Sequence, residues 1–593
     1  MTTDNLLVLL KSLEANVSLN ETAIYEALED YRQNSTCSEK ELEAERIAFA
    51  FLENEISIPY PLDGVNTVFK PCINLNHQAQ GALVFPNLGH INADTVQYWA
   101  MRMEDTRNLV FKARYAGLLW DFCTKYTQQF NKQKINFAQV RIDAVVDMIE
   151  AELHKNFSCT LNIKIKLKHA LILAMRINNS ERINVLKKTI LNYESSIKGD
   201  LAVDAWSISY NLLLRDKKIK LSTEEEIGII TRISDRLENL VNPLPNRFEI
   251  RCINVIREAS CMLAEYYQKK QNKAEITLIL DKYLRAVLQQ SEQSTSAIAS
   301  NKILQEAHDV MEKYNQHAYK ETIIKKLQTI GSKLISELKP TSIKIRLDMQ
   351  SIDLFVEKIT QGNLKDCLCQ LIDIPQKSDT SQQLQDLIRK FPIQFLFQNC
   401  IIDNEGRTTT IIQPPTSDEE SHIIKLTAQN LKLSALIERL ILEKIFRYYS
   451  VNTEILIEHF YQYLLFNFID KKLLEHSLAA YLKFDVITFL HVIIPQIENM
   501  LRCYLKQKGQ AVTKHTRNGG FNYLTFDELL RHKEIENSFG KEICFYFRVV
   551  FTDARGLNLR NDVCHGIFSS NQFTQDIADI VFIALLTLTK KIE

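Results

Sequence analysis

Apolar residues recur at spacings of three and four along most of the chain, which is the period of amphipathic helices. Residues 1–55 show this pattern in two or three helices, one of which is expected to begin near Ser38 ahead of an acidic first turn. From about 136 to 385, successive helices are joined by short polar breaks such as Asn178-Asn179-Ser180. We therefore predict antiparallel helical hairpins stacked as a tetratricopeptide-like array without a strict repeat, an architecture that usually presents a surface to another macromolecule.

An interruption of the helical pattern falls at residues 56–92. Four prolines and three glycines occur there, so we expect a long irregular connection. A helix from about Asn92 to Phe130, with Asp94 as its candidate cap, is expected to follow.

A second change of pattern, near 393–415, predicts a small β-hairpin. Ile393–Phe397 and Thr408–Ile412 flank the turn-forming residues Asp403–Arg407, and Pro414-Pro415 closes the hairpin. Helical periodicity resumes at about Ser417. The predicted parts of the chain are an N-terminal helical region at 1–135, the helical array at 136–385, the β-hairpin with connecting helices at 386–480, and a C-terminal helical domain at 481–593.

The composition fits this all-α interpretation. Only 15 glycines and 12 prolines occur in 593 residues, which favours long helices over many short strands. Lys plus Arg and Asp plus Glu both total 72, so the overall charge does not suggest wrapping of nucleic acid or adhesion to an anionic membrane. This balance does not argue against a local basic groove. We interpret the basic stretch Lys164–His169 as a solvated helix face. The apolar stretch Ile580–Leu586 is far shorter than the roughly 20 residues that span a bilayer, so we expect no integral membrane segment.

The 12 cysteines are scattered without a C-x-x-C pair, and most lie in apolar helical patterns where a reduced thiol acts as a small hydrophobic residue. This usage favours a reducing, cytoplasmic compartment, and the N-terminal residues do not have the pattern of a secretory signal. Cys367 and Cys369 lack the further ligands of a zinc site, and so do His77 and His90. We expect neither a metal nor another cofactor.

One segment near the C-terminus could carry chemistry. A helix with Pro495–Arg502 is followed by a loop containing Arg517–Gly520, and a polar run then extends from Asp553 to Gly566. An apolar helix from about Phe573 to Leu588 comes next. We expect four core helices, with an irregular polar turn ahead of the last.

The 481–570 stretch resembles the domain of unknown function 4209, a member of the HEPN (higher eukaryotes and prokaryotes nucleotide-binding) superfamily. The resemblance rests on Pro-x-Ile-Glu-x-x-x-Arg at 495–502, on Leu-x-x-Leu-Leu at 526–530 with Phe526 in place of the first leucine, and on Asp-x-Arg-Gly-x-Asn-x-Arg-Asn-x-x-x-His-Gly at 553–566. It implies a HEPN-like four-helix domain that pairs with a second copy.

A further, weaker match is Ala-Arg-Tyr-Ala-x-x-Leu-Trp at 113–120, which is similar to a segment often found in the N-terminal helical region of such proteins. Its simplest interpretation is helix packing, in which Trp120 anchors the core and Arg114 pairs with a carboxylate of a neighbouring helix.

The resemblance implies a ribonuclease site at Arg560, Asn561 and His565. HEPN ribonucleases carry an Arg-x(4–6)-His element, usually with a polar residue after the arginine, and cut RNA through its own ribose 2′-hydroxyl without a metal. A histidine that titrates near neutrality can move the 2′-hydroxyl proton, while an arginine stabilises charge on the phosphorane. Asn561 would orient one of them. The supporting residues are Glu498, Arg502, Asp553, Arg555, Gly556, Asn558 and Gly566.

A structural role for these residues stays open. On an ideal helix a five-residue step turns through roughly 500°, which leaves Arg560 and His565 about 140° apart. Their convergence requires the helix to end at His565 with Gly566 in the left-handed conformation, or a second protomer to complete the site. Alternatively, Arg560 pairs with Glu498 or Asp553, Asn561 caps a turn, and His565 bonds a loop carbonyl, which would only fix a tight polar turn.

The sequence therefore predicts an array that recognises a protein partner and a C-terminal domain that forms a homodimer and cleaves RNA, in stress response or defence. The alternative is a non-catalytic scaffold whose HEPN-like domain mediates only dimerisation and partner binding. Peripheral attachment to a membrane is a third interpretation, because relatives of this domain occur in membrane-associated proteins.

Overall fold

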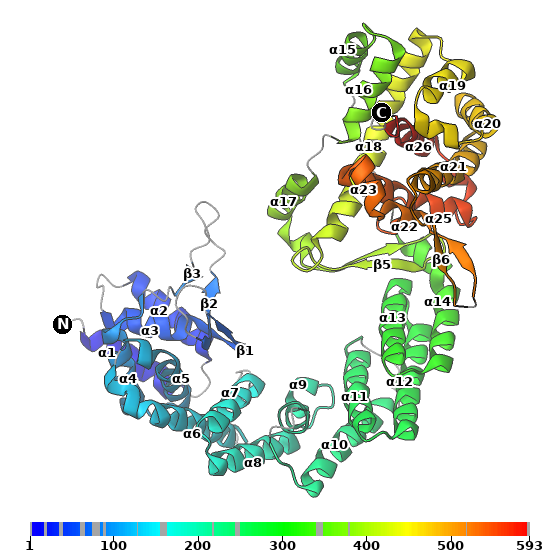
Figure 1. The fold of residues 1–593 in the computed structure, drawn as a ribbon. Coiled ribbons are helices and arrows are strands. Elements are labelled where there is room, and N and C mark those ends of the chain that lie inside the picture. The colour runs from blue at the N-terminus through cyan, green and yellow to red at the C-terminus, as the bar shows by residue number, and fades with distance from the viewer. Residues whose placement is uncertain are drawn as a thin grey trace. The chain divides into compact units, whose positions relative to one another are not determined.

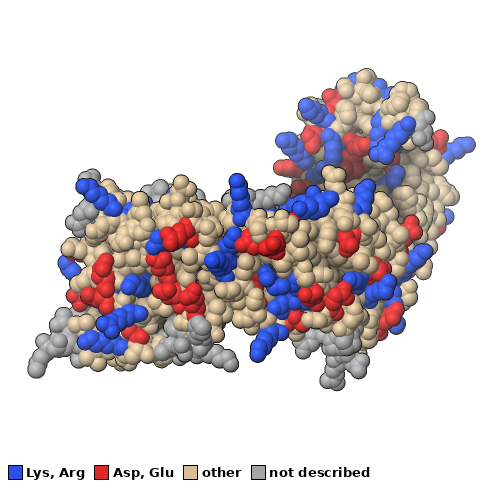
Figure 2. Space-filling model, turned by 90° about the horizontal axis from the view of Figure 1, so that it is seen from below, with Lys and Arg blue, Asp and Glu red and all other residues tan. Residues whose placement is uncertain are grey.

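The computed structural model describes residues 3–16, 20–34, 40–59, 66–73, 84–86, 90–126, 128–153, 163–215, 219–242, 250–339, 348–376, 380–517 and 519–589. Most of these residues are helical and the strands are short, as the hydrophobic pattern predicts (Figure 1). The chain divides into two compact units, Met1–Lys326 and Leu327–Glu593. Over the described ranges, no helix is long and apolar enough to cross a membrane. Cations and carboxylates are interspersed on the face shown in Figure 2.

The first unit begins with three helices, which confirms the prediction for residues 1–55; Ser38 lies outside the described residues. These helices are α1 (Thr3–Ala15), α2 (Glu21–Asn34) and α3 (Lys40–Ala50).

A three-stranded antiparallel sheet follows, in the order β1-β2-β3, so the prediction of an irregular connection at 56–92 is wrong where these residues are described. Two of the prolines that suggested a loop lie within the strands: Pro59 is the last residue of β1, and Pro71 pairs with the first residue of β1. Proline is tolerated at such ends of a ladder. The strands are β1 (Phe51–Pro59), β2 (Asn66–Ile73) and β3 (Val84–Phe85).

The single helix expected from Asn92 to Phe130 is in fact two, α4 (Ala93–Asp105) and α5 (Leu109–Tyr126). Asn92 caps α4 in place of Asp94, because its side-chain oxygen accepts a backbone N–H of the first turn at 2.9 Å. Asn108 caps α5 in the same way, which explains the break between them. Its side chain accepts the Val110 N–H at 2.9 Å.

Several charged side chains of the first unit are buried. Arg114 is fully buried and pairs with Glu21 of α2 at 2.5 Å, which confirms its predicted pairing, whereas Trp120 is only half-buried. The interpretation of Lys164–His169 as a solvated face is wrong, because Lys166 is buried and pairs with Glu21 at 2.9 Å. A charge run cannot reveal such burial, since its partners come from distant parts of the sequence.

The remaining helices of the first unit pack mainly on their neighbours in sequence. Polar breaks separate them at Asn178–Asn179, as predicted, and also at Lys198–Asp200. The tetratricopeptide-like stacking itself stays a prediction. These elements are η2 (Gln128–Gln133), α6 (Lys134–Leu153), α7 (Ile163–Arg176), α8 (Ser180–Ser196), α9 (Val203–Trp206), η3 (Tyr210–Leu214), α10 (Thr223–Val241), α11 (Ile250–Lys269), α12 (Lys273–Gln293), α13 (Ala297–Lys313) and α14 (His317–Glu337), the last of which continues into the second unit.

The second unit contains the β-hairpin predicted near 393–415, although its first strand begins at Asn399, and residues 392–395 form a short helix instead. The elements are α15 (Met349–Ile359), α16 (Leu364–Gln376), α17 (Thr380–Lys390), η4 (Pro392–Phe395), β4 (Asn399–Ile402), β5 (Thr408–Ile412), α18 (Glu419–Tyr448), α19 (Thr453–Tyr461), η5 (Leu464–Phe468), α20 (Lys471–Leu482), α21 (Val486–Gln507), β6 (Thr513–His515), β7 (Phe521–Tyr523), α22 (Phe526–Leu530), α23 (Lys533–Phe539), α24 (Lys541–Phe547), η6 (Arg548–Thr552), α25 (Leu559–Cys564), η7 (Ser570–Gln572) and α26 (Gln575–Thr587).

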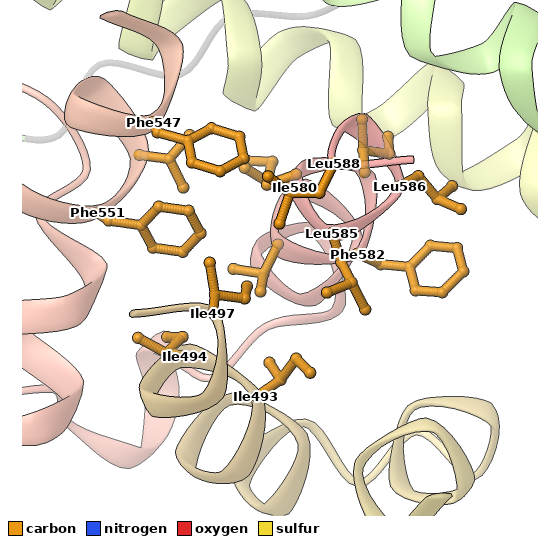
Figure 3. Packing of buried hydrophobic residues seen from close by; sticks show 14 of the residues in the cluster. Ile493, Ile494, Ile497, Phe547, Phe551, Ile580, Phe582, Leu585, Leu586 and Leu588 are labelled. Atoms are coloured by element: carbon orange, nitrogen blue, oxygen red, sulfur yellow. The ribbon is translucent and has the colours of Figure 1, made fainter. Parts of the chain in front are cut away.

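One hydrophobic core fills the second unit, and α26 is its central helix. Every residue from Ile577 to Thr587 is buried. Isoleucines of α21 and phenylalanines of α24 and η6 pack around it, as Figure 3 shows. Because α26 is apolar on all sides, it also needs α16 and α18 as cover, and both pack against it. This core therefore includes helices well before residue 481.

Candidate functional site

The polar run 553–566 comprises a turn after η6, the short helix α25 and the end of that helix, and Asp553 and Arg555 hold the start of the turn. The Arg555 guanidinium donates to both carboxylate oxygens of Asp553, at 2.8 and 2.7 Å, and also to the Ser421 hydroxyl of α18 at 2.9 Å. Burial opposes ionisation of Asp553, but the hydrogen bonds from Arg555 are stronger in sum and lower the pKa of this carboxyl. The pair therefore fixes the turn to α18.

Gly556 lets the turn approach η6 closely. A Cβ at this position would lie 2.2 Å from the Val549 carbonyl oxygen, which belongs to backbone that cannot move aside cheaply. The next residue, Leu557, donates its N–H to the same oxygen at 2.7 Å. Glycine is thus required here by the close approach of two backbone segments.

The first turn of α25 is held by amide side chains. Asn558, the residue before the helix, has a left-handed backbone (φ 51°) and donates to Asp562 at 2.8 Å. Asn561 donates to the Asn558 side-chain oxygen at 2.7 Å and to the Thr552 carbonyl oxygen at 3.4 Å. Asn561 therefore ties α25 back to the end of η6.

The Arg560 side chain adjoins this network and pairs with a residue of α21. Its Nε donates to Glu498 at 2.9 Å, and its Nη1 donates to Asn561 at 3.3 Å. The second oxygen of Glu498 accepts from Arg502 at 2.5 Å, so one buried carboxylate lies between two guanidinium groups. The three side chains together carry a net positive charge. The Arg560 side chain is 25% exposed, and its Nη2 donates to none of the described residues.

His565 ends α25 and is exposed. Gly566 follows in the left-handed conformation (φ 68°), which is one of the two conditions named in the sequence analysis for Arg560 and His565 to converge. Among described residues, the imidazole has no hydrogen-bond partner, and nothing in the same chain joins it to Arg560. The structure therefore connects Arg560, Asn561, Glu498 and Arg502 directly, but leaves His565 separate at the end of the same helix.

A cavity of about 730 Å³ lies on the β4–β5 side of this turn. Asn558, Asn561 and Asp562 line it from the turn, and Asp403 and Arg407 line it from the hairpin. Burial raises the pKa of Asp562, and the nearby Asp403 carboxylate adds to this shift. Neither Arg560 nor His565 lines the cavity, so Asn561 is the residue that the cavity and the Arg560–Glu498 pair share.

The sequence analysis missed the hairpin β6–β7 beside this site. Its residues were expected to form a loop around Arg517–Gly520, yet Thr513–His515 pairs with Phe521–Tyr523. The Arg502 guanidinium lies 5.1 Å from the centre of the Tyr523 ring, so the hairpin adjoins the Glu498 network. Asn-Gly between β-branched and aromatic residues is a known hairpin signal and could have revealed it.

No group of three or more His, Cys, Asp or Glu side chains that could hold a metal occurs in the ranges that the structure describes. Comparison of the chain with protein-family models, with curated proteins and with solved structures gave no match.

Proposed function

We propose that the chain is a metal-independent, RNA-cleaving protein of HEPN type, acting through Arg560, Asn561 and His565 in paired C-terminal domains. The observation that supports this proposal best is the hydrogen bonding and exposure of the Arg560 and His565 side chains. Arg560 is held by Glu498 and Asn561 yet keeps Nη2 available, and His565 is exposed without a hydrogen-bond partner in the described residues. A fixed cation with a free donor and an unengaged imidazole suit binding of a phosphate and transfer of a proton.

The chemistry assigns each side chain one task. His565 accepts the ribose 2′-hydroxyl proton as the 2′-oxygen attacks phosphorus, and the bond to the 5′-oxygen then breaks, leaving a 2′,3′-cyclic phosphate. Arg560 stabilises the charge that develops on the phosphorane oxygens. The departing 5′-oxygen needs a proton, which the His565 of a second copy supplies. This requirement for both a base and an acid is the chemical reason for a dimer.

A non-catalytic scaffold is the second candidate, and specific contacts favour it. Glu498 already neutralises part of the charge of Arg560, and Asn561 fixes the turn through Asn558 without any substrate. Such a network would stabilise an assembly domain equally well. In this case the helical array, with its tetratricopeptide-like stacking, would supply the surface for a protein partner.

The two candidates separate in a cleavage assay. Wild type, Arg560→Ala and His565→Ala are incubated with a mixed RNA pool in EDTA, and their melting is followed in parallel. His476→Ala serves as a matched control, because His476 is an exposed histidine of the same unit on α20.

We expect wild type and His476→Ala to cleave RNA in EDTA, and His565→Ala to be slower by at least about a hundredfold. The stability of His565→Ala should change by less than about 0.5 kcal/mol, because the imidazole is exposed. Cleavage that persists in His565→Ala would show that the site assignment is wrong. Absence of cleavage in wild type, together with a lower melting temperature of His565→Ala, would favour the scaffold.

A further inference from the structure

The β6–β7 hairpin projects from the second unit without burying anything of its own. All six strand residues, Thr513–His515 and Phe521–Tyr523, are exposed, so neither face of these two strands contributes to a core. An isolated two-stranded hairpin has little stability from packing. Gly519 and Gly520 form its turn with φ values of 78° and 93°, which favour glycine. Core packing therefore accounts only for the base of the hairpin, where Val512 is buried and accepts a hydrogen bond from the Leu524 N–H at 2.9 Å, and not for the six exposed strand residues.

One face of the hairpin carries a row of aromatic rings. Tyr523 and Phe521 alternate with Asn522 along β7, so both point to the same side, and the pairing places His515 opposite Phe521. The rings of His515 and Phe521 lie 5.6 Å apart. Phe521 is 73% exposed and Tyr523 is 63% exposed. Residues two apart in a strand are separated by about 7 Å, which is close to the distance covered by two successive base-stacking steps along a nucleic-acid strand.

Positive charge gathers around the same hairpin. Between Glu498 and Asp527 the chain has no Asp or Glu and has five cations, Arg502, Lys506, Lys508, Lys514 and Arg517. Lys514 pairs with Glu528, and Arg502 with Glu498, but the other three form no ion pair with a described residue. In a chain with equal totals of cations and carboxylates, this local excess suits a polyanion.

A continuous series of contacts leads from the hairpin to the candidate site. The Tyr523 ring lies 5.1 Å from the guanidinium of Arg502, which donates to Glu498 at 2.5 Å. Glu498 in turn accepts from Arg560 at 2.9 Å. A chain bound along the aromatic row would therefore arrive next to Arg560.

We propose that the β6–β7 hairpin holds single-stranded RNA beside the candidate site, with unpaired bases stacked on Phe521 and Tyr523 and phosphates near Arg517, Lys506 and Lys508. The assignment of RNA rests on the function proposed above. Exposed aromatic rings among cations bind single strands, because every base offers a ring face, whereas bases within a duplex are stacked on each other and unavailable.

The test measures binding apart from cleavage. The full chain is titrated against a fluorescent 2′-O-methyl oligouridine of about 16 nucleotides, which has no free 2′-hydroxyl to attack phosphorus. The double variant Phe521→Ala/Tyr523→Ala is compared with Phe397→Ala/Tyr448→Ala. The control pair removes one phenylalanine and one tyrosine that are 66% and 65% exposed elsewhere in the second unit.

We expect the hairpin double variant to bind at least about tenfold more weakly than wild type, and the control double variant to stay within about twofold. Tyr523→Phe should retain binding, because it keeps the ring. Arg517→Ala should reduce the dependence of log K on log salt by about one unit. Melting curves of all variants should coincide with that of wild type, since the removed side chains are exposed.

The outcomes separate this proposal from the proposed function. If wild type cleaves RNA and the hairpin double variant binds and cleaves equally well, the role of the hairpin is wrong while the nuclease stands. If wild type binds the oligouridine through the hairpin but cleaves nothing, the hairpin assignment stands and the nuclease fails. Wild type that fails to bind the oligouridine, or that binds anionic phosphatidylserine vesicles through Phe521 and Tyr523 instead, overturns the proposal.

Discussion

Glu438 of α18 and Asp579 of α26 place two carboxyl groups in the core of the second unit. Both are buried, at 2% and 0% exposure. Burial raises the pKa of Glu438 to about 7, and the neighbouring Asp579 adds to the shift, although a hydrogen bond from Ser434 opposes it. Burial also raises the pKa of Asp579, against hydrogen bonds from Tyr481 and Gln575. The core therefore favours the protonated form of each group.

We predict that the second unit loses stability as the pH rises from about 5 to 8. A carboxyl whose pKa is raised on folding contributes stability below its unfolded value, near 4.5, and that contribution is lost as the pH rises through about 7. The loss from Glu438 alone is on the order of 3 kcal/mol at pH 8. Glu438→Gln should therefore be more stable than wild type at pH 8 and less dependent on pH, as urea unfolding would measure. Glu458→Gln, an exposed change on α19 of the same unit, is the control, and an equal pH dependence in all three proteins would contradict the prediction.

Gly556 provides a second prediction about a single residue. Gly556→Ala should lower the free energy of unfolding by more than about 2 kcal/mol, because its Cβ would lie 2.2 Å from the Val549 carbonyl oxygen. Gly228→Ala is a suitable control, because nothing lies within 4 Å of a Cβ there and alanine favours helix. Equal melting temperatures of Gly556→Ala and wild type would refute the tight approach.

The conformation of a single residue was predictable where its place in the backbone favours one residue type. Gly566 ends α25 in the left-handed conformation, one of the two alternatives of the sequence analysis, because a helix end favours glycine there; this end does not bring His565 to Arg560. The burial of Lys166 was not predictable, since its partner Glu21 lies far away in the sequence. The catalytic roles of Arg560, Asn561 and His565 stay predictions. The sequence left two partners open for Arg560, Glu498 and Asp553, and the structure pairs it with Glu498.

At the scale of elements, α25 is a helix of six residues that depends on its neighbours. So short a helix has little stability of its own. The Arg560–Glu498 pair joins it to α21, so we predict that Glu498→Gln lowers the free energy of unfolding by about 1–3 kcal/mol. Arg560 and Arg502 would then face each other without the carboxylate between them.

Urea denaturation with Glu475→Gln as control would test this link between α21 and α25. Glu475 forms an exposed pair with Lys471 one turn away, so its loss should cost less than about 0.5 kcal/mol. If the two variants prove equally stable, α25 is held by the asparagine contacts alone.

The sequence predicted elements well where one period repeats for several turns, as in the helices on either side of Asn178–Asn179. It also located the β4–β5 hairpin from its turn residues, but not β1–β3 or β6–β7. These strands are short, and proline within β2 or glycine beside β7 resembles a loop in composition. The break between α4 and α5 was missed although residues 104–108 are all polar and asparagine, here Asn108, is a common helix cap.

At the scale of the whole molecule, we predict self-association through the 481–593 domain, because cleavage needs both a proton acceptor and a proton donor. Light scattering of the full chain at micromolar concentration should give the mass of a dimer, and the specific activity should fall on dilution below the dissociation constant. A monomer that cleaves RNA at every concentration would exclude a site shared between two copies. A monomer without activity would count against the catalytic proposal.

The division of the chain was harder to predict than its elements. A boundary was expected near residue 386, yet α16 and α18 share one core with α21 and α26. The sequence shows that α26 is apolar, but it does not show which helices cover it, because that depends on contacts between residues more than a hundred positions apart. The finer division at 136, 386 and 481 stays a prediction.

The position of α26 also has a consequence for synthesis on the ribosome. This helix is the centre of the second unit, but it is translated after every helix that packs on it. While the chain emerges, the apolar faces of α16, α18 and α21 lack their common partner, so the nascent protein exposes surface that chaperones recognise. A frameshift or stop codon ahead of Gln575 would leave that surface uncovered for good, and such truncated products should be degraded or aggregate even though most of their helices are intact.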